Sequence, residues 1–192
     1  MSARLFTSAT ANIHVTSHTA AIDDDDMESG TLIIKRRGPN KLEFLMSYVG
    51  RNALSVALRD NTVEVYTPRN NTIRPYDLRK YRDIVQQLML LGFGMSGTEL
   101  ASKYQIRNLG SEAIEGQDST HLDLVPKSPD VLKQLKRVEI WISAASSYPL
   151  RQKLYLGGGD YRLVTYSGVR INPKVSWEAL ELPKKAKREP VQ

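Results

Sequence analysis

Period-two alternation of apolar and polar residues is the feature that most constrains how this chain can fold. Apolar side chains occupy every second position from Leu42 to Tyr48, and the pattern resumes from Leu54 to Leu58 after the turn sequence Gly50-Arg51-Asn52. A strand with one wet face and one buried face produces this pattern, because successive side chains point to opposite faces. The two runs therefore predict a long β-hairpin.

Similar short runs recur through the rest of the chain and predict about eleven strands in all. The additional segments are 13–19, 30–36, 63–65, 73–76, 104–107, 113–115, 122–124, 138–142, 150–156 and 161–165. So many antiparallel strands can manage their edges only in a sandwich, a barrel or a strongly curved sheet. The sequence therefore indicates a mainly β fold.

The middle of the chain departs from period two. Residues 78–91 carry an apolar stripe at spacings of three and four residues, which predicts a helix that ends near Gly92. The sequence Ser96-Gly97-Thr98-Glu99 has the form of a capping box, so a second short helix should run to about Lys103. A third is indicated by Ser128-Pro129-Asp130, which places proline in the first helical turn.

Two or three short helices are few for so large an apolar sheet face, and this imbalance suggests an unfilled cavity. Protein interiors pack at a density of about 0.74, which so few helices do not supply. The segment 88–95 contains only apolar residues and glycine, and its Met89 and Met95 side chains could repack around an apolar ligand. A buried helix end with a glycine C-cap explains the same segment equally well.

Composition restricts the class of protein. With 192 residues, 41% hydrophobic and 25% charged, the chain suits a globular protein of one domain. No apolar run approaches the roughly 18 residues of a membrane span, and the N-terminus lacks the pattern of a signal peptide. The absence of cysteine excludes disulfides. The net charge of +6 is partly concentrated near the end, so we expect a single domain over 1–183 and a basic, flexible tail over 184–192.

Motifs for catalysis and metal binding fail on their context. The sequence from Gly92 to Gly97 matches G-x-G-x-x-G, but it follows a predicted helix instead of a strand. A G-x-S-x-G motif and cysteine are both absent. His14 and His18 lie about 13 Å apart along a strand, too far to share a metal, so they are expected to face solvent.

Two further ligand classes are also set aside. Asp23–Asp26 lacks the spacing of a calcium loop and is expected to form a solvated turn. The tyrosines do not cluster with basic residues as in nucleic-acid binders. We therefore expect no enzyme activity, no metal, no cofactor and no nucleic-acid partner, and the chain is not expected to be transmembrane.

Several segments resemble, in order, the motifs of a known family. Residues 30–42 are similar to its G-x-L-x-[VI]-x-[KR]-P-x-x-[FL] strand and turn, and residues 62–68 to x-L-W-x-Y-x-P. Residues 121–127 resemble [FL]-x-L-x-P-K, and residues 169–173 with Trp177 and Leu182-Pro183 resemble the closing strands. The family is that of the periplasmic outer-membrane lipoprotein carriers of the LolA type, whose relatives include LolB-like and RseB-like proteins.

This resemblance implies a fold and a function. The fold is a strongly curved antiparallel sheet, or unclosed β-barrel, with the helices as a lid over an apolar cavity. The function is to shelter the acyl chains of a lipoprotein, or another lipid, between an inner-membrane release complex and an outer-membrane acceptor. It implies a periplasmic location, whereas the N-terminus by itself leaves two alternatives, a cytoplasmic protein or one whose export signal has been removed. We also expect a monomer.

The resemblance also implies which residues serve the cavity. The expected ligand-binding residues of the sheet and lid are Leu32, Ile34, Leu42, Phe44, Met46, Leu54, Val56, Leu88, Leu91, Phe93 and Met95. Family carriers hold the lid shut through an arginine that donates to lid carbonyls, and guanidinium donors suit several carbonyls at once. Arg36 is the expected residue because it shares parity with Leu32 and Ile34, and Arg37 is its rival.

A second function class fits the same fold. Relatives reuse the curved sheet in sensors or regulators that bind a lipid or a misfolded protein and signal to a membrane partner, and fold alone does not separate the two classes. A regulator normally carries a second interaction domain, which is not visible after Pro183. The carrier function is therefore the leading hypothesis.

Overall fold

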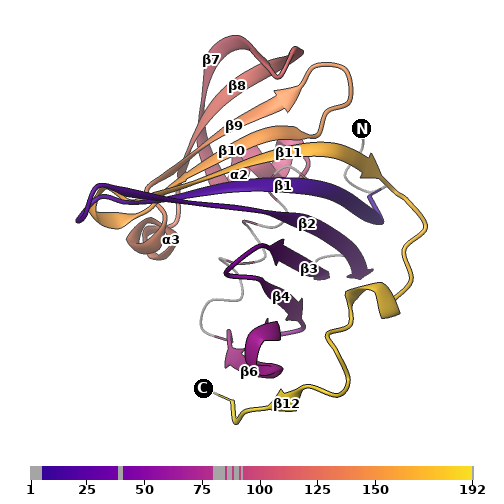
Figure 1. The fold of residues 1–192 in the computed structure, drawn as a ribbon. Helices are drawn as coiled ribbons and strands as arrows, with labels where there is room; N and C mark the ends of the chain where they lie inside the picture. Colours follow the sequence, from indigo (N-terminus) through magenta and orange to yellow (C-terminus); the bar gives the residue numbers. More distant parts are fainter. Residues whose placement is uncertain are drawn as a thin grey trace. The chain divides into compact units, whose positions relative to one another are not determined.

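Strands dominate the structure, a computed structural model that describes residues 6–38, 41–79, 85, 88, 91 and 93–191. Twelve strands form one sheet in the order β12-β6-β5-β4-β3-β2-β1-β11-β10-β9-β8-β7 (Figure 1). They are β1 (Ser8–Thr19), β2 (Asp24–Gly38), β3 (Lys41–Val49), β4 (Leu54–Arg59), β5 (Thr62–Thr67), β6 (Thr72–Asp77), β7 (Tyr104–Ile114), β8 (Gln117–Pro126), β9 (Arg137–Ser143), β10 (Pro149–Tyr155), β11 (Tyr161–Ile171) and β12 (Lys187–Arg188). The order is linear, so the sheet is open, and the prediction of a mainly β fold on one large unclosed sheet is confirmed.

Short helices are few, as the sequence predicts. The helix α2 (Gly97–Lys103) begins with the expected capping box, in which the Glu99 amide donates to Ser96 Oγ at 3.2 Å and the Ser96 amide donates to Glu99 Oε2 at 2.8 Å. The helix α3 (Pro129–Gln134) has proline in its first turn, also as expected. The described residues add three short 3-10 turns, η2 (Pro68–Asn70), η3 (Gly157–Gly159) and η4 (Glu178–Leu180).

The helix expected over 78–91 lies largely outside the described residues. Val85 and Leu88, which are described, are helical and half-buried. Among the residues that the structure describes, no helix is both long enough and apolar enough to cross a bilayer.

The chain divides into two compact units, each described by itself below. The first unit contains His14–Met27 and Leu91–Ser167, and the second contains Phe6–Ile13, Glu28–Leu90 and Gly168–Gln192. The second unit thus holds the predicted hairpin and the C-terminal segment, while the first holds β7 to β10 with α2 and α3.

The predicted hairpin of the second unit forms as β3 and β4. Phe44 of β3 lies opposite Ile34 of β2 and Leu58 of β4, so the alternating apolar side chains share one face. Gly30 is needed at the start of this pairing, because a Cβ there would lie 2.2 Å from the Ser47 carbonyl oxygen. Such an approach is open only to glycine, which fixes where β2 and β3 meet.

The opposite face of this unit is covered by the C-terminal segment. Leu182 packs against Ala57 of β4 and Ile73 of β6, and all three are buried. Arg59 donates from Nη2 to the Leu180 carbonyl at 2.7 Å. The segment therefore completes a small apolar core on the side of the sheet away from Phe44.

The basic tail differs from its expected flexibility. Residues 187–188 form β12, which pairs in parallel with β6, and Arg188 forms an ion pair with the buried carboxylate of Glu64. Arg74 donates from Nε to Glu189 Oε2 at 2.7 Å. Without β12, β6 would be the edge strand and would have a row of unpaired backbone groups. The tail pairs with this edge, which its local sequence does not predict.

The meander of the first unit has two chemically different faces. Leu124 of β8 lies opposite Val138 of β9 on a largely apolar face, and both side chains are fully buried. Asp123 and Glu139, one position earlier and later, lie opposite each other on the other face. Sequence parity alone thus separates an apolar surface from a charged one.

The two histidines of β1 have different surroundings. His14 is exposed on its strand, as predicted. His18 is half-buried, stacks on Tyr161 with 4.7 Å between ring centroids, and shares a 2.9 Å hydrogen bond with Asp25. Of the acidic run expected as a turn, Asp23 lies in the turn of residues 20–23, as predicted, whereas the rest of the run forms the exposed start of β2. His18 gains this partner from the neighbouring strand of its own hairpin.

Candidate functional site

A short stretch, residues 91 and 93–95, covers part of the apolar face of the first unit. Leu91 and Phe93 are 2% and 5% exposed, and Met95 is half-buried. The Phe93 ring meets Tyr166 of β11 edge to face, with 5.3 Å between centroids. These three residues lie outside the strands and helices, yet Leu91 and Phe93 are buried as deeply as the side chains of the sheet. We call residues 91 and 93–95 the covering segment.

A buried glutamine holds the covering segment to the sheet. Gln152 of β10 is 5% exposed and donates from Nε2 to the Leu91 carbonyl at 2.6 Å. Its Oε1 accepts a 2.8 Å hydrogen bond from the Tyr166 hydroxyl. A buried amide left without partners is costly, so both bonds favour the covered arrangement.

Gln152 and Tyr166 are not among the residues predicted from the sequence. The sequence does hold a sign of Gln152, which alternates with Leu150 and Leu154 and is therefore a polar residue in an otherwise apolar series. Its register partners confirm the placement, since it lies opposite Ile140 of β9 and Val164 of β11. The Leu91 carbonyl, 61 positions away, could not be inferred from local pattern.

The predicted ligand-binding residues separate into two groups. Leu91, Phe93 and Met95 belong to the first unit, and the remaining predicted residues belong to the second. In the second unit Leu32, Ile34, Leu42 and Phe44 are buried, whereas Met46, Leu54, Val56 and Leu88 are half-buried. Within β2, β3 and β4 the register places the predicted residues on one face. Ligand binding by either group stays a prediction.

Arg36 and Arg37 lie on opposite faces of β2. Arg36 is opposite Leu42, on the apolar face, and donates from Nε to the Phe6 carbonyl at 2.9 Å. This is the expected type of bond, a guanidinium donor to a backbone carbonyl, although Phe6 belongs to the N-terminal segment. Because most of residues 78–91 lie outside the described part, the role of Arg36 as a lid latch stays a prediction.

Arg37, the rival, is engaged on the other face. It donates from Nε to Glu43 Oε1 at 2.5 Å, and its guanidinium lies 4.5 Å from the Trp177 ring centroid. The hydrogen bond to the Glu43 carboxylate raises the pKa of Arg37 above its ordinary value. Lys35 lies on the same Trp177 ring at 4.0 Å, so the indole is contacted by two cations.

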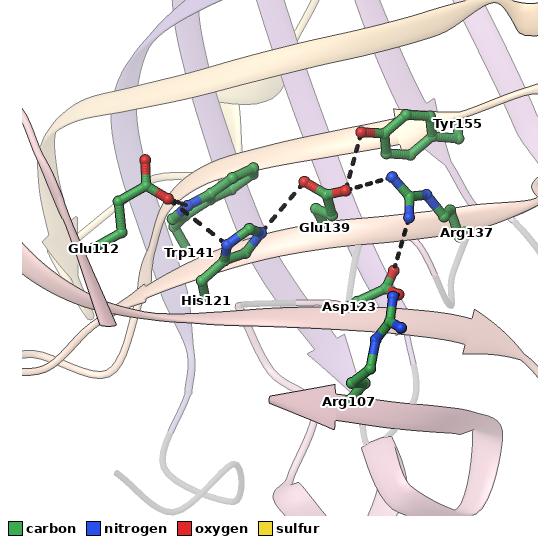
Figure 2. A network of polar contacts seen from close by, with 8 residues as sticks. All are labelled: Arg107, Glu112, His121, Asp123, Arg137, Glu139, Trp141 and Tyr155. Carbon is green, nitrogen blue, oxygen red and sulfur yellow. Dashed lines mark hydrogen bonds and ion pairs between the residues drawn. The ribbon is translucent and has the colours of Figure 1, made fainter. Parts of the chain in front are cut away.

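The charged face of the first unit carries a connected polar network (Figure 2). Glu139 accepts from Arg137 at 2.5 Å and from the Tyr155 hydroxyl at 3.0 Å, and it lies 3.3 Å from His121 Nε2. Arg107 donates to the buried carboxylate of Asp123 at 2.7 Å. Oppositely charged partners therefore join neighbouring strands β7, β8 and β9.

The same network includes a stacked aromatic pair. His121 stacks on Trp141 with 4.1 Å between centroids, and Trp141 donates from Nε1 to Glu112 at 2.6 Å (Figure 2). The Glu112 carboxylate also lies 3.6 Å from His121 Nδ1. The carboxylates drawn in Figure 2 each have a protein partner, so these groups bind one another and stabilise the strands. In the described part of the chain, no group of three or more His, Asp or Glu side chains is arranged to hold a metal.

Solved structures share this fold. Neither a family model nor a curated protein matches the chain. An uncharacterized conserved protein from Thermus thermophilus aligns with a TM-score of 0.61 and 11% identity, over 98% of this chain and 92% of that one. MucB aligns with a TM-score of 0.56 and 11% identity, over 94% and 59%. Lipoprotein LppX of Mycobacterium tuberculosis aligns at 0.50 and 14%, over 90% of each chain. At these identities the likeness shows the fold, and the unclosed, curved antiparallel sheet that the family resemblance implies is confirmed, while the helical lid and the apolar cavity stay predictions.

Proposed function

We propose that this protein is a periplasmic carrier that shelters the acyl chains of lipoproteins, or another lipid, during transfer between membranes. The observation that carries the proposal is the covering segment, which buries Leu91 and Phe93 against an apolar sheet face. It is joined to the sheet by a side-chain hydrogen bond from Gln152. A cover held in this way can leave without breaking the pairing between strands.

The energetics of an acyl chain suit such a cover. Each buried CH₂ contributes about 0.8 kcal/mol, so a long chain gains much from an apolar face yet must still be released. When no lipid is present, Leu91 and Phe93 cover the face and contribute about 1.5–3 kcal/mol each, less than a long acyl chain, so such a chain can displace them. Exchange of one apolar occupant for the other keeps the face covered in both states.

The remaining parts of the proposal follow from the family resemblance. The donor would be an inner-membrane release complex and the recipient an outer-membrane acceptor. The protein would act without catalysis and without a cofactor. The fold shared with LppX, which is itself a lipoprotein, supports a lipid-related function.

Displacement of a fluorescent fatty acid tests the proposal. Wild type is expected to bind the probe. Val164→Asp, at a position opposite Gln152 on the apolar face, is expected to bind it at least about tenfold more weakly, because the substitution places a charge where the acyl chain would lie. Leu109→Asp is the matched control, since Leu109 is 42% exposed on β7. Circular dichroism establishes that each variant is folded. A folded wild type that ignores the probe would refute the proposal.

A sensor or regulator is the second candidate, and the likeness to MucB favours it. MucB of Pseudomonas aeruginosa has been solved in complex with MucA, and that chain aligns with this one at a TM-score of 0.54. Vesicle assays separate the two functions. A carrier accelerates the transfer of a fluorescent acylated peptide from donor to acceptor vesicles, whereas a sensor binds the peptide without accelerating its transfer.

A further inference from the structure

Gln152 is a hydrogen-bonding group built into an otherwise apolar face. Its register neighbours Ile140 and Val164 are both aliphatic, and Ile140 is 1% exposed. Glutamine is seldom buried, and a buried amide must be satisfied by partners. A leucine at this position would cover the same face without that requirement. The amide therefore serves something other than simple packing.

The two partners of Gln152 fix which end of its amide faces the covering segment. The Leu91 carbonyl can only accept, so the atom that faces it is the NH₂ nitrogen, and Oε1 on the other side accepts from the Tyr166 hydroxyl. The Leu91 carbonyl then accepts at 2.6 Å. The pair Gln152 and Tyr166 is thus an oriented donor that recognises a carbonyl oxygen.

Displacement of Leu91 leaves this donor without its acceptor. A ligand made only of hydrocarbon would enter the face but would not replace the lost bond, and a buried unsatisfied donor is unfavourable. A ligand with an ester or amide carbonyl near the top of its acyl chains would restore the bond. The same donor would thereby serve the empty and the loaded states.

From this geometry we infer that Gln152, oriented by Tyr166, is a carbonyl-recognition group that selects acyl esters and amides over chains without a carbonyl. The inference rests on the proposed function and specifies its ligand class. The backbone carbonyl of Leu91 stands in for the ligand carbonyl when no lipid is bound. Acyl-chain length would set affinity through apolar contact, while Gln152 would set the chemical class of the linkage.

Competition between matched lipids tests the inference. The probes are a phosphatidylcholine with two ester-linked hexadecanoyl chains and the analogue with two ether-linked hexadecyl chains, each displacing the same fluorescent fatty acid. Wild type is expected to prefer the ester by about tenfold, the effect of one buried hydrogen bond. Gln152→Leu is expected to bind both lipids equally. Gln105→Leu, the same substitution at an exposed position of β7, should keep the preference.

A second variant guards against a folding defect in Gln152→Leu. Tyr166→Phe keeps the aromatic ring and the Gln152 amide but removes the hydroxyl that orients this amide. The preference for the ester lipid should therefore fall, while the affinity for the ether lipid is unchanged. Equal binding of ester and ether by wild type would overturn the carbonyl inference and leave the carrier proposal standing. If neither lipid displaces the bound probe, the carbonyl inference is overturned and the carrier proposal stands, whereas a wild type that does not bind the probe itself would overturn both.

Discussion

Replacement of Gln152 by leucine should destabilise the unliganded protein. The substitution removes two hydrogen bonds, of 2.6 Å to the Leu91 carbonyl and 2.8 Å from the Tyr166 hydroxyl, and leaves that carbonyl buried. An unsatisfied buried acceptor costs about 1–3 kcal/mol, and the added apolar surface of leucine offsets part of it. We therefore expect the free energy of unfolding to fall by about 1–2 kcal/mol, which for a chain of this size lowers Tm by roughly 2–8 °C.

Urea denaturation measures this loss, and hydrogen exchange localises it. Amides of the covering segment should exchange faster in Gln152→Leu, whereas those of β4 and β5 in the second unit should keep their wild-type rates. Gln105→Leu provides the control for the loss of an amide at an exposed strand position. If Gln152→Leu were as stable as this control and the amides of the covering segment exchanged as slowly as in wild type, the hydrogen bond from Gln152 would not hold the covering segment on the sheet.

Three further changes test other parts of the structure. Ser96→Ala removes the capping hydroxyl of α2 and should cost about 0.5–2 kcal/mol, detected as faster amide exchange in α2 alone. Leu182→Ala leaves a cavity against β4 and β6 and should lower the free energy of unfolding, measured in urea, by about 2–5 kcal/mol. An unchanged free energy would contradict the packing of Leu182 at this position. The hydrogen bond from Arg74 lowers the pKa of Glu189, so this pair stabilises the docked tail above pH 4.5, the ordinary value, and is lost as pH falls through the lowered pKa. Arg74→Gln should return the pKa of Glu189 to its ordinary value in an NMR titration, and an unchanged value would exclude the pair in solution.

Local sequence pattern predicted the parts of the fold that depend on local interactions. The alternation from Leu42 to Leu58 indicated the hairpin and its buried face, because strand parity fixes which side chains point together. The capping box at Ser96 and the proline at Pro129 located α2 and α3, since each motif satisfies the helix terminus beside it. Parity also placed Arg36 on the apolar face, where the structure has it.

Long-range partners could not be predicted in the same way. Gln152 was visible as a polar residue among leucines, but its acceptor lies in a segment far away in the chain. The C-terminal segment docks by pairing with the edge strand β6 and by packing against Ile73. The basic run at 184–188 predicts neither contact by itself. Charge alone predicts solvation, so the ion pair with Glu64 was missed.

Mass spectrometry of lipids extracted from natively purified protein tests the central claim most directly. Acyl-containing lipids with ester or amide linkages are expected to copurify with wild type in near-stoichiometric amounts, and Val164→Asp should purify with far less. Leu109→Asp, purified in parallel, should carry the wild-type amount. The wild type is expressed in cells that have a periplasm and purified without detergent. A folded wild type that then yields no lipid would contradict the claim that this protein shelters acyl chains.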